Sequence, residues 1–289
     1  MKNQDFELYQ SLLQKNSGLT IGPDKTYLLE SRLTPIAKKW GYTSLDDMTR
    51  ALHKKRDEKL ITQIIEAMAT NETLFFRDLK PFKLFEEVVL PHMFENRRPG
   101  QPIKIWCAAA STGQEPYSLA MVLKDNEDKL KGRKCEILAT DISNLALEKA
   151  REAKYTQFEV QRGMSVQYLM KYFTQDGDKW RLRDEIRNMV KFDYFNLLGD
   201  MSRLGTFDVI FCRNVLIYFD EATKRQVLQN LAGRLVTDGF LFLGGAETVL
   251  GITDKFKPVS DKRGIYVHNS TQAPAAEGAK KVLERSKKQ

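Results

Sequence analysis

Residues 103–116 of the chain read IKIWCAAASTGQEP, an apolar run followed by small residues and a proline. The run predicts a buried β-strand over residues 103–107, and Pro116 suits the first turn of a helix that extends to residue 123. Further strands are predicted over residues 136–140, 190–195, 207–212 and 240–243, with helices over residues 144–153 and 221–235. Strands that alternate with helices predict an α/β fold with a mainly parallel sheet covered on both faces.

The first 70 residues show helical periodicity instead. Leu29, Leu33, Ile36 and Trp40 fall on one face of a helix, which Pro35 is expected to kink or divide. Further helices are expected from Ser44 and over residues 60–68, and no strand is indicated before residue 100. We therefore expect a small all-α domain over residues 1–78 and an α/β domain over residues 79–270.

Residues 162–187 fit the alternation poorly. The turn sequence at residues 176–178 (DGD) lies between two short strand candidates, which predicts a small antiparallel β-subdomain inserted in the second domain. Residues 264–268 could add a closing edge strand to the main sheet. From residue 271 to residue 289 the chain is rich in Ala, Lys and Glu and is expected to be a flexible tail.

Composition narrows the class of protein. The chain has 289 residues, of which 42% are hydrophobic, so wholesale disorder is excluded. No apolar run approaches the roughly 18 residues of a membrane span, and no signal peptide is visible at the start. Three distant cysteines and three histidines give neither a disulfide framework nor a metal site, which favours a cytoplasmic protein. The net charge of +8 suits nucleic acid, an acidic protein partner or only a soluble surface.

Polar residues follow the predicted strands at ends that meet at one edge of a parallel sheet, where such folds bind ligands. After the first strand, Gly113 is the only glycine of the loop, which is a poor cradle for a pyrophosphate. Glu115 favours a cationic group such as an amino-acid ammonium. Asp141, after the second strand, suits the hydroxyls of a ribose, although a helix N-cap is the alternative.

The third and fourth strands add to this pattern. Asn196 and Leu197 offer an amide and an apolar cover for an adenine ring. Arg213 and Asn214 interrupt an apolar run, as ligand contacts often do. Together these residues offer a carboxylate for a ribose, an apolar surface for an adenine and a second carboxylate for an ammonium group. Because a phosphate-binding loop is not visible, this combination suggests S-adenosylmethionine as the ligand.

Four segments then carry a specific resemblance: residues 71–77 (NETLFFR), 109–118 (AASTGQEPYS), 139–142 (ATDI) and 211–220 (FCRNVLIYFD). In this order they resemble the chemotaxis receptor glutamate O-methyltransferases, the CheR family, and the resemblance runs from about residue 5 to 268. It implies transfer of the methyl group of S-adenosylmethionine to glutamate side chains of chemoreceptors, with S-adenosylhomocysteine as the second product. The implied fold is an N-terminal helical domain and a Rossmann-like methyltransferase domain with an inserted β-subdomain.

The resemblance also implies site residues. The cofactor contacts would be Asn71, Thr73, Arg77, Glu115, Asp141, Asn196, Leu197, Asn214 and Val215. Arg77 and Tyr218 would border the reacting centre, with Phe75 and Phe76 packed as core beside Arg77. Gln114 stands where many relatives have a second glutamate.

A partner is implied as well: the cytoplasmic helical bundle of a chemoreceptor, met by a basic helix of the N-terminal domain. Lys25, Arg32 and Lys39 recur at intervals of seven, with Lys38 nearby, although Pro35 departs from the continuous arginine-rich helix expected of the family. The basic run at residues 53–56 is either part of this surface or a solvated helix face. Residues 280–289 supply +4 of the net charge of +8, so half of the excess charge lies in the predicted tail. What matters for the remaining charge is its placement on the N-terminal helices, which indicates an acidic helix bundle as the partner rather than nucleic acid.

Some relatives also grip a receptor C-terminal pentapeptide through a longer β-subdomain loop with a Gly-x-Gly sequence. Residues 174–179 (TQDGDK) contain no such sequence, so we expect an enzyme that does not depend on a pentapeptide. Separately, we expect a monomer that does not insert in the membrane.

Two alternatives remain at this point. A nucleic-acid methyltransferase would share the fold and cofactor and would use the basic surface to hold phosphates. Residues 214–216 (NVL) replace the Asn-Pro-Pro-Tyr motif or nucleophilic cysteine that such enzymes usually need. A non-catalytic module that senses S-adenosylmethionine is the other; the presence of Arg77, Glu115, Asp141 and Tyr218 argues against it.

Overall fold

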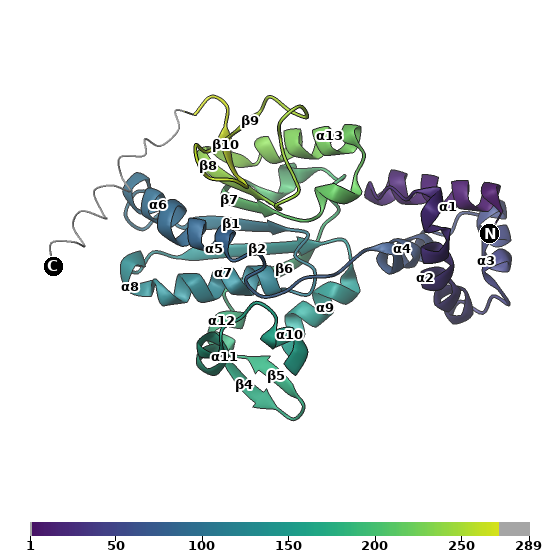
Figure 1. Cartoon of the computed structure of the whole chain (residues 1–289), viewed down its shortest axis with the longest axis horizontal. Helices are drawn as coiled ribbons and strands as arrows, with labels where there is room; N and C mark the ends of the chain where they lie inside the picture. The colour runs from purple at the N-terminus through teal and green to yellow at the C-terminus, as the bar shows by residue number, and fades with distance from the viewer. Residues whose placement is uncertain (1, 272–289) are drawn as a thin grey trace.

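The computed structural model describes residues 2–271, so the predicted tail beyond Thr271 lies outside the described residues. Figure 1 shows three parts: a helical N-terminal domain, a central sheet with helices around it, and a small sheet beside the central one. The predicted α/β fold with an N-terminal helical part and a separate small antiparallel sheet is confirmed. No helix among the described residues has the length and apolar content needed to cross a membrane.

The N-terminal part consists of four helices, α1 (Asn3–Ser17), α2 (Thr26–Lys39), α3 (Leu45–Lys54) and α4 (Glu58–Met68), with a short 3₁₀ turn, η1 (Pro23–Lys25), before α2. The side chain of Ser44 caps α3 by accepting from the backbone N–H of Asp47, and Asp57 caps α4 in the same way. A separate hydrophobic cluster joins the helices, with Tyr9, Leu29, Leu33, Met48 and Ile64 completely buried. The domain boundary at residues 78–79 stays a prediction.

Helix α2 is continuous through Pro35, so of the two expected effects of this proline the division of the helix is excluded, and a kink stays a prediction. Proline removes one backbone hydrogen bond from a helix. Here Leu33 and Ala37, on either side of it, are both buried against the neighbouring helices. Tertiary packing of the apolar face therefore outweighs the local cost of the proline.

The central sheet has seven strands in the order β6-β2-β1-β7-β8-β10-β9. The first five are parallel: β6 (Val190–Tyr194), β2 (Cys135–Asp141), β1 (Ile103–Ala108), β7 (Phe207–Cys212) and β8 (Leu235–Leu243). Strand β10 (Ile265–His268) runs antiparallel to β8 and lies inside the sheet, because β9 (Phe256–Pro258) pairs with its other side. The sequence analysis missed β9 and was wrong to expect residues 264–268 at the edge.

Alternation along the strands divides the interior into two clusters, one on each face of the sheet. Ile105 and Cys107 of β1 contribute to one cluster, and Trp106 and Ala108 to the other. The helices of this domain are α5 (Lys80–Leu84), the π-helical turn η2 (Phe85–Val89), α6 (Leu90–Asn96), α7 (Gln114–Asp125), α8 (Glu127–Leu130), α9 (Asn144–Glu152) and α13 (Glu221–Ala232), with 3₁₀ turns η3 (Met201–Leu204) and η4 (Leu216–Tyr218).

The β-subdomain contains three antiparallel strands in the order β3-β5-β4, namely β3 (Lys154–Thr156), β5 (Lys179–Leu182) and β4 (Phe173–Asp176). Helices α10 (Gln157–Gln161), α11 (Val166–Tyr172) and α12 (Asp184–Arg187) accompany them. The β4–β5 hairpin was predicted, but β3 was missed. The small sheet therefore begins at Lys154, before the predicted boundary at residue 162.

Candidate cofactor and active site

The strand order places four loops around one pocket. The chain runs from β1 to β2 and β6 on one side and returns to β7 on the other, so the crevice between β1 and β7 is the switch point where doubly wound folds bind ligands. The pocket holds about 880 Å³, counting the part open to solvent. Its lining comes from the loops after β1, β2, β6 and β7, from residues 69–77 and from the end of α1.

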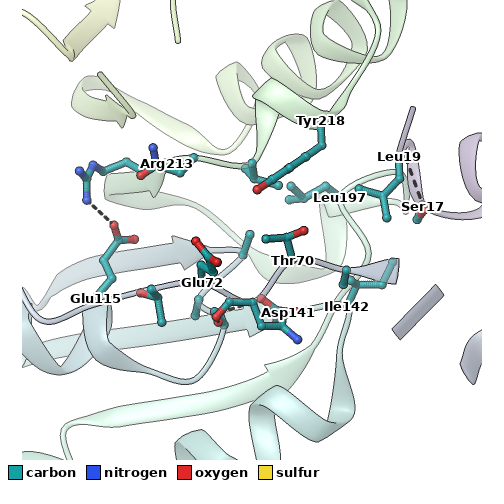
Figure 2. Close-up of a pocket in the computed structure, with 18 of the residues that line it drawn as sticks. Ser17, Leu19, Thr70, Glu72, Glu115, Asp141, Ile142, Leu197, Arg213 and Tyr218 are labelled. Carbon is teal, nitrogen blue, oxygen red and sulfur yellow. Dashed lines mark hydrogen bonds and ion pairs between the residues drawn. The ribbon is translucent and has the colours of Figure 1, made fainter. Parts of the chain in front are cut away.

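Glu115 lies at one end of the pocket, in the first turn of α7 (Figure 2). Its Oε2 accepts a hydrogen bond from Arg213 Nη1 at 2.8 Å, and the Arg213 side chain is 1% exposed. Burial raises the pKa of Glu115, although the Arg213 guanidinium acts against this shift. Within residues 2–271, Oε2 is the Glu115 oxygen that has a hydrogen-bond partner, so Oε1 remains for a cation in the pocket.

Asp141 ends β2 and is also buried. Its Oδ2 accepts from the backbone N–H of Ser111 at 2.7 Å, and its Oδ1 accepts from that of Ser143 at 2.9 Å. Burial raises the pKa of Asp141, against the effect of these backbone donors. Ser143, not Asp141, caps α9, so the helix N-cap alternative for Asp141 is excluded. The carboxylate is fixed in orientation and still has lone pairs for ribose hydroxyls.

The loop after β1 adopts an uncommon backbone conformation. Ala109 and Ser111 have φ angles of 63° and 52°, and Gly113 has 95°. A non-glycine residue in this region costs free energy, and such residues gather at functional sites. Ala109, Ala110 and Ser111 line the pocket, so their small side chains leave the backbone open to a ligand.

Residues 69–79, which we call the strap, connect α4 to α5, and residues 69–73 and Arg77 of this segment line the pocket. The Asn71 carbonyl accepts from Ser111 Oγ at 2.8 Å, and the Phe76 N–H donates to Ser118 Oγ at 2.9 Å. Arg213 donates to the Arg77 carbonyl at 3.1 Å and to Asp78 Oδ2 at 2.6 Å. The strap is therefore tied to α7 and to the loop after β7.

The N-terminal domain completes the pocket at the end away from Glu115, where Figure 2 shows Ser17 and Leu19. The side-chain amide of Asn196 donates to the Asn16 carbonyl at 2.6 Å. The Thr20 N–H donates to the Tyr218 carbonyl at 2.9 Å. These N-terminal residues were missed by the sequence analysis, because nothing in the local sequence of α1 marks its end as part of a pocket.

A buried carboxylate that the sequence analysis also missed shapes the loop after β7. Glu247 accepts from the backbone N–H groups of Asn214 (2.8 Å), Val215 (2.9 Å), Ile217 (3.3 Å) and Gly244 (2.6 Å). Asn214 has a φ of 59°, which these bonds help to hold. Glu247 thus fixes the segment that leads to Tyr218.

The structure brings all predicted pocket residues together. The nine predicted cofactor contacts and Tyr218 line the pocket: Asn71, Thr73, Arg77, Glu115, Asp141, Asn196, Leu197, Asn214, Val215 and Tyr218. Their roles stay predictions. Phe75 and Phe76 are buried, as predicted.

The predicted docking residues lie apart from the pocket. Lys25, Lys38 and Lys39 are exposed at the two ends of α2. Arg32 differs, because its Nη1 donates to the Met68 carbonyl at 2.8 Å and to the Ala69 carbonyl at 3.3 Å. It caps the C-terminus of α4 where the strap begins.

The donor set fits S-adenosylmethionine. Glu115 at one end offers a negative charge for the ammonium, Asp141 offers acceptors for the ribose, and Leu19 and Leu197 give an apolar end for the adenine (Figure 2). Among the described residues, no group of three or more His, Cys, Asp or Glu residues could hold a metal ion.

Comparison with known proteins agrees with this geometry. Residues 4–69 match the family described as "CheR methyltransferase, all-alpha domain", and residues 71–265 match "CheR methyltransferase, SAM binding domain".

Similar curated proteins are the chemotaxis protein methyltransferase Cher2 of Pseudomonas putida (38% identity over 91% of this chain and 97% of that protein), chemotaxis protein methyltransferase 1 of Vibrio cholerae (40%, 92% and 96%) and chemotaxis protein methyltransferase 1 of Pseudomonas aeruginosa (39%, 91% and 97%). The chain therefore belongs to the CheR methyltransferase family, and its cofactor is S-adenosylmethionine.

Proposed function

We propose that this methyltransferase esterifies glutamate side chains of chemoreceptors, giving glutamyl methyl esters and S-adenosylhomocysteine. The observation that carries the proposal is that Arg77 and Tyr218 line the same pocket as Glu115 and Asp141. One cationic side chain and one phenol stand beside a site suited to the cofactor. A carboxylate substrate is the class of nucleophile that such a pair can orient.

The proposed methyl transfer requires orientation of the substrate rather than acid–base catalysis by the protein. When bound, S-adenosylmethionine supplies an electrophilic methyl group on a sulfonium. A glutamate is ionised at neutral pH, so no general base is needed. Accordingly, none of the described residues that line the pocket is a histidine or a cysteine. Arg77 attracts and orients the incoming carboxylate with its planar fork, and Tyr218 aligns it by hydrogen bonding. Leu19, Val215 and Phe219 help to exclude water from the pocket.

The receptor would dock on the basic ends of α2. The exposed side chains of Lys25, Lys38 and Lys39 carry the positive charge that an acidic helical bundle would attract. Arg32 would have two roles, because it also bonds to the Met68 carbonyl next to the strap. The β4–β5 hairpin is closed by a two-residue turn, Gly177–Asp178, which supports independence from a receptor pentapeptide. Micromolar binding of such a pentapeptide in calorimetry would contradict that part. We further propose that the enzyme acts as a monomer in the cytoplasm, where the methylated region of a chemoreceptor lies.

Tritiated S-adenosylmethionine mixed with receptor-containing membranes tests the reaction. Label that enters the receptor and is released as volatile methanol by base supports a glutamyl ester. Base-stable label, label in added RNA, or no transfer at all would refute the proposal; the last two would favour a nucleic-acid methyltransferase and a non-catalytic binding module.

Two variants separate binding from turnover. We expect Asp141→Ala to weaken S-adenosylhomocysteine binding in calorimetry by tenfold or more, about 1.4 kcal/mol, because the ribose acceptor is lost. Tyr218→Phe should leave that affinity nearly unchanged and lower kcat. Equal loss of affinity in both variants would show that these roles are misassigned.

A further inference from the structure

The β-subdomain supports the strap that carries Arg77. The ring of Phe75 is completely buried and packs edge-on against Tyr155 of β3 (centroids 5.0 Å apart) and Phe173 of β4 (5.5 Å). The ring of Phe76 lies 4.8 Å from that of Tyr168 in α11. Both aromatic residues that precede Arg77 are thus held by this small sheet and its helix.

Gly163, between α10 and α11, lies directly against the backbone of the strap at Phe75. Its φ is +83°, and a Cβ at this position would lie 2.0 Å from the carbonyl oxygen of Phe75 and 2.9 Å from Cδ1 of Leu74. Side chains essentially never approach a backbone atom so closely, and a carbonyl oxygen cannot rotate away as a side chain does. Any larger residue at position 163 must therefore displace the strap or the subdomain.

The displacement would act on the bonds that hold the backbone around Arg77, because the Phe76 N–H is bonded to Ser118 and the Arg77 carbonyl to Arg213. Upstream, the Asn71 carbonyl is bonded to Ser111, at the end of the strap that also carries Thr73. Phe76 and Asp78 already have positive φ angles of 50° and 69°, so the segment around Arg77 has little conformational freedom left. Arg77 is two residues from the point of contact.

We propose that the β-subdomain is a positioning element for Arg77 and that it acts through Gly163 and the Phe75 ring contacts. This inference rests on the proposed role of Arg77 in catalysis. It gives the subdomain a part in turnover that requires no bound pentapeptide. It also predicts that a partner which moves the subdomain changes the rate of methylation.

Gly163→Ala, compared with Gly177→Ala, tests the proposal. Gly177 lies in the same subdomain with a φ of +64°, but a Cβ there meets nothing within 4 Å, so the control carries the backbone strain without the collision. Because misplacement by about 1 Å can cost up to about 100-fold in rate, we expect Gly163→Ala to lower kcat about tenfold or more. Its Kd for S-adenosylhomocysteine should rise no further than that of Arg77→Ala, since Arg77 is itself a predicted cofactor contact. Equal kcat values in the two variants, or a Kd that rises further in Gly163→Ala than in Arg77→Ala, would overturn the inference.

A double-mutant cycle with Arg77→Ala tests whether the effect of Gly163→Ala on kcat is transmitted through Arg77. If Gly163 acts through Arg77, the glycine substitution should cost little further kcat in the Arg77→Ala background. Multiplicative losses would overturn the inference. Full kcat in Arg77→Ala alone would instead refute the proposed role of Arg77, which separates the two failures.

Phe173→Leu provides the same cycle if Gly163→Ala does not fold, as judged by circular dichroism. It removes one ring contact to Phe75 and keeps an apolar side chain of similar size. A kcat loss that disappears in the Arg77→Ala background supports positioning. An unchanged kcat, or a loss that persists in that background, contradicts it.

Discussion

At the scale of single residues, the pocket depends on carboxylates with different partners. Glu115 pairs with a buried arginine, Asp141 with two backbone N–H groups, and Glu247 with four. Glu115 and Asp141 face the pocket, whereas Glu247 organises the backbone behind it. Their chemistry is the same, so only their surroundings distinguish a ligand-binding acid from a positioning acid.

Glu247→Gln should loosen the loop that carries Asn214 and Val215. The NH2 group of glutamine, which replaces one carboxylate oxygen, cannot accept hydrogen bonds, so the backbone donors on that side lose their partner, at a cost of about 1–3 kcal/mol each. We expect a lower melting temperature and weaker S-adenosylhomocysteine binding, measured by thermal unfolding and calorimetry. Glu221→Gln is the control, since Glu221 is an exposed residue of α13. Equal behaviour of the two variants would contradict a positioning role for Glu247.

The affinity for S-adenosylhomocysteine should fall at acid pH. Burial raises the pKa values of Glu115 and Asp141, so both take up protons above the usual carboxyl range. Protonation would remove the charge predicted to hold the ammonium and one of the acceptors predicted for the ribose. We expect the Kd to rise as the pH falls from neutrality toward the usual carboxyl range, measured by calorimetry, and to rise less steeply in Glu115→Gln.

The same shifts act on stability with the opposite sign. A folded-state pKa above the unfolded value means that the folded protein binds more protons in the window between the two values. The contribution of these two groups to the free energy of unfolding without ligand therefore grows as pH falls through that window.

For the binding prediction, a Kd for S-adenosylhomocysteine that does not change with pH would show that neither carboxylate contacts the ligand.

At the scale of secondary-structure elements, helix α2 combines a structural and a predicted docking role. Its apolar face buries Leu29, Leu33 and Ala37, while Lys38 and Lys39 are exposed in the last turn. Basic residues at a helix C-terminus also interact favourably with the helix dipole. The periodicity of the sequence revealed both faces, but it gave no indication that Arg32 is bonded to the end of α4.

Lys38→Ala/Lys39→Ala should impair receptor docking only. Loss of two charges facing an acidic bundle is expected to raise the KM for receptor about threefold or more at low ionic strength, with kcat and cofactor affinity unchanged, and the effect should shrink as salt is added. Lys129→Ala/Lys134→Ala is the matched control, since these exposed lysines lie in and just after α8, at the opposite end of the molecule from α2 (Figure 1). Equal effects of the two double variants would refute docking on α2.

At the scale of the whole molecule, the pocket is shared between domains. Ser17 and Leu19 of the N-terminal domain line it, and Gln14 Nε2 donates to Asp220 Oδ2 at 2.6 Å across the interface. Gly18, the C-cap of α1 with a φ of +76°, lies where a Cβ would be 3.0 Å from Thr223 Cγ2 and 3.1 Å from Phe219 Cδ1. The orientation of the N-terminal domain therefore sets the shape of the cofactor site.

Gly18→Ala should weaken S-adenosylhomocysteine binding, because the new methyl group pushes the end of α1 away from the 219–223 segment. We expect an increase in Kd of about threefold or more, which corresponds to a loss of about 0.7 kcal/mol of binding free energy. Gly41→Ala is the control: its φ is +77°, and a Cβ there meets nothing within 4 Å. Calorimetry should show normal affinity for that variant, and a similar loss in both would indicate general strain instead of a shared pocket.

The sequence by itself determined the alternating strands, the helical N-terminal part and the pocket residues that follow β1, β2, β6 and β7. This was possible because periodicity is a local property and because parallel strands place their carboxyl ends at one edge. The short strands β3 and β9 escaped detection, since three residues carry too little pattern and are stabilised by pairing with distant strands.

Only the tertiary structure decided what holds the site in place. The contacts of Gly163 with Phe75, of Glu247 with Asn214 and of Thr20 with Tyr218 join residues far apart in the chain. No local pattern encodes them, because a turn glycine, a glutamate after a strand or a threonine after a helix looks the same in any protein. The sequence predicted residues that line the pocket, and packing between distant segments determined their positions.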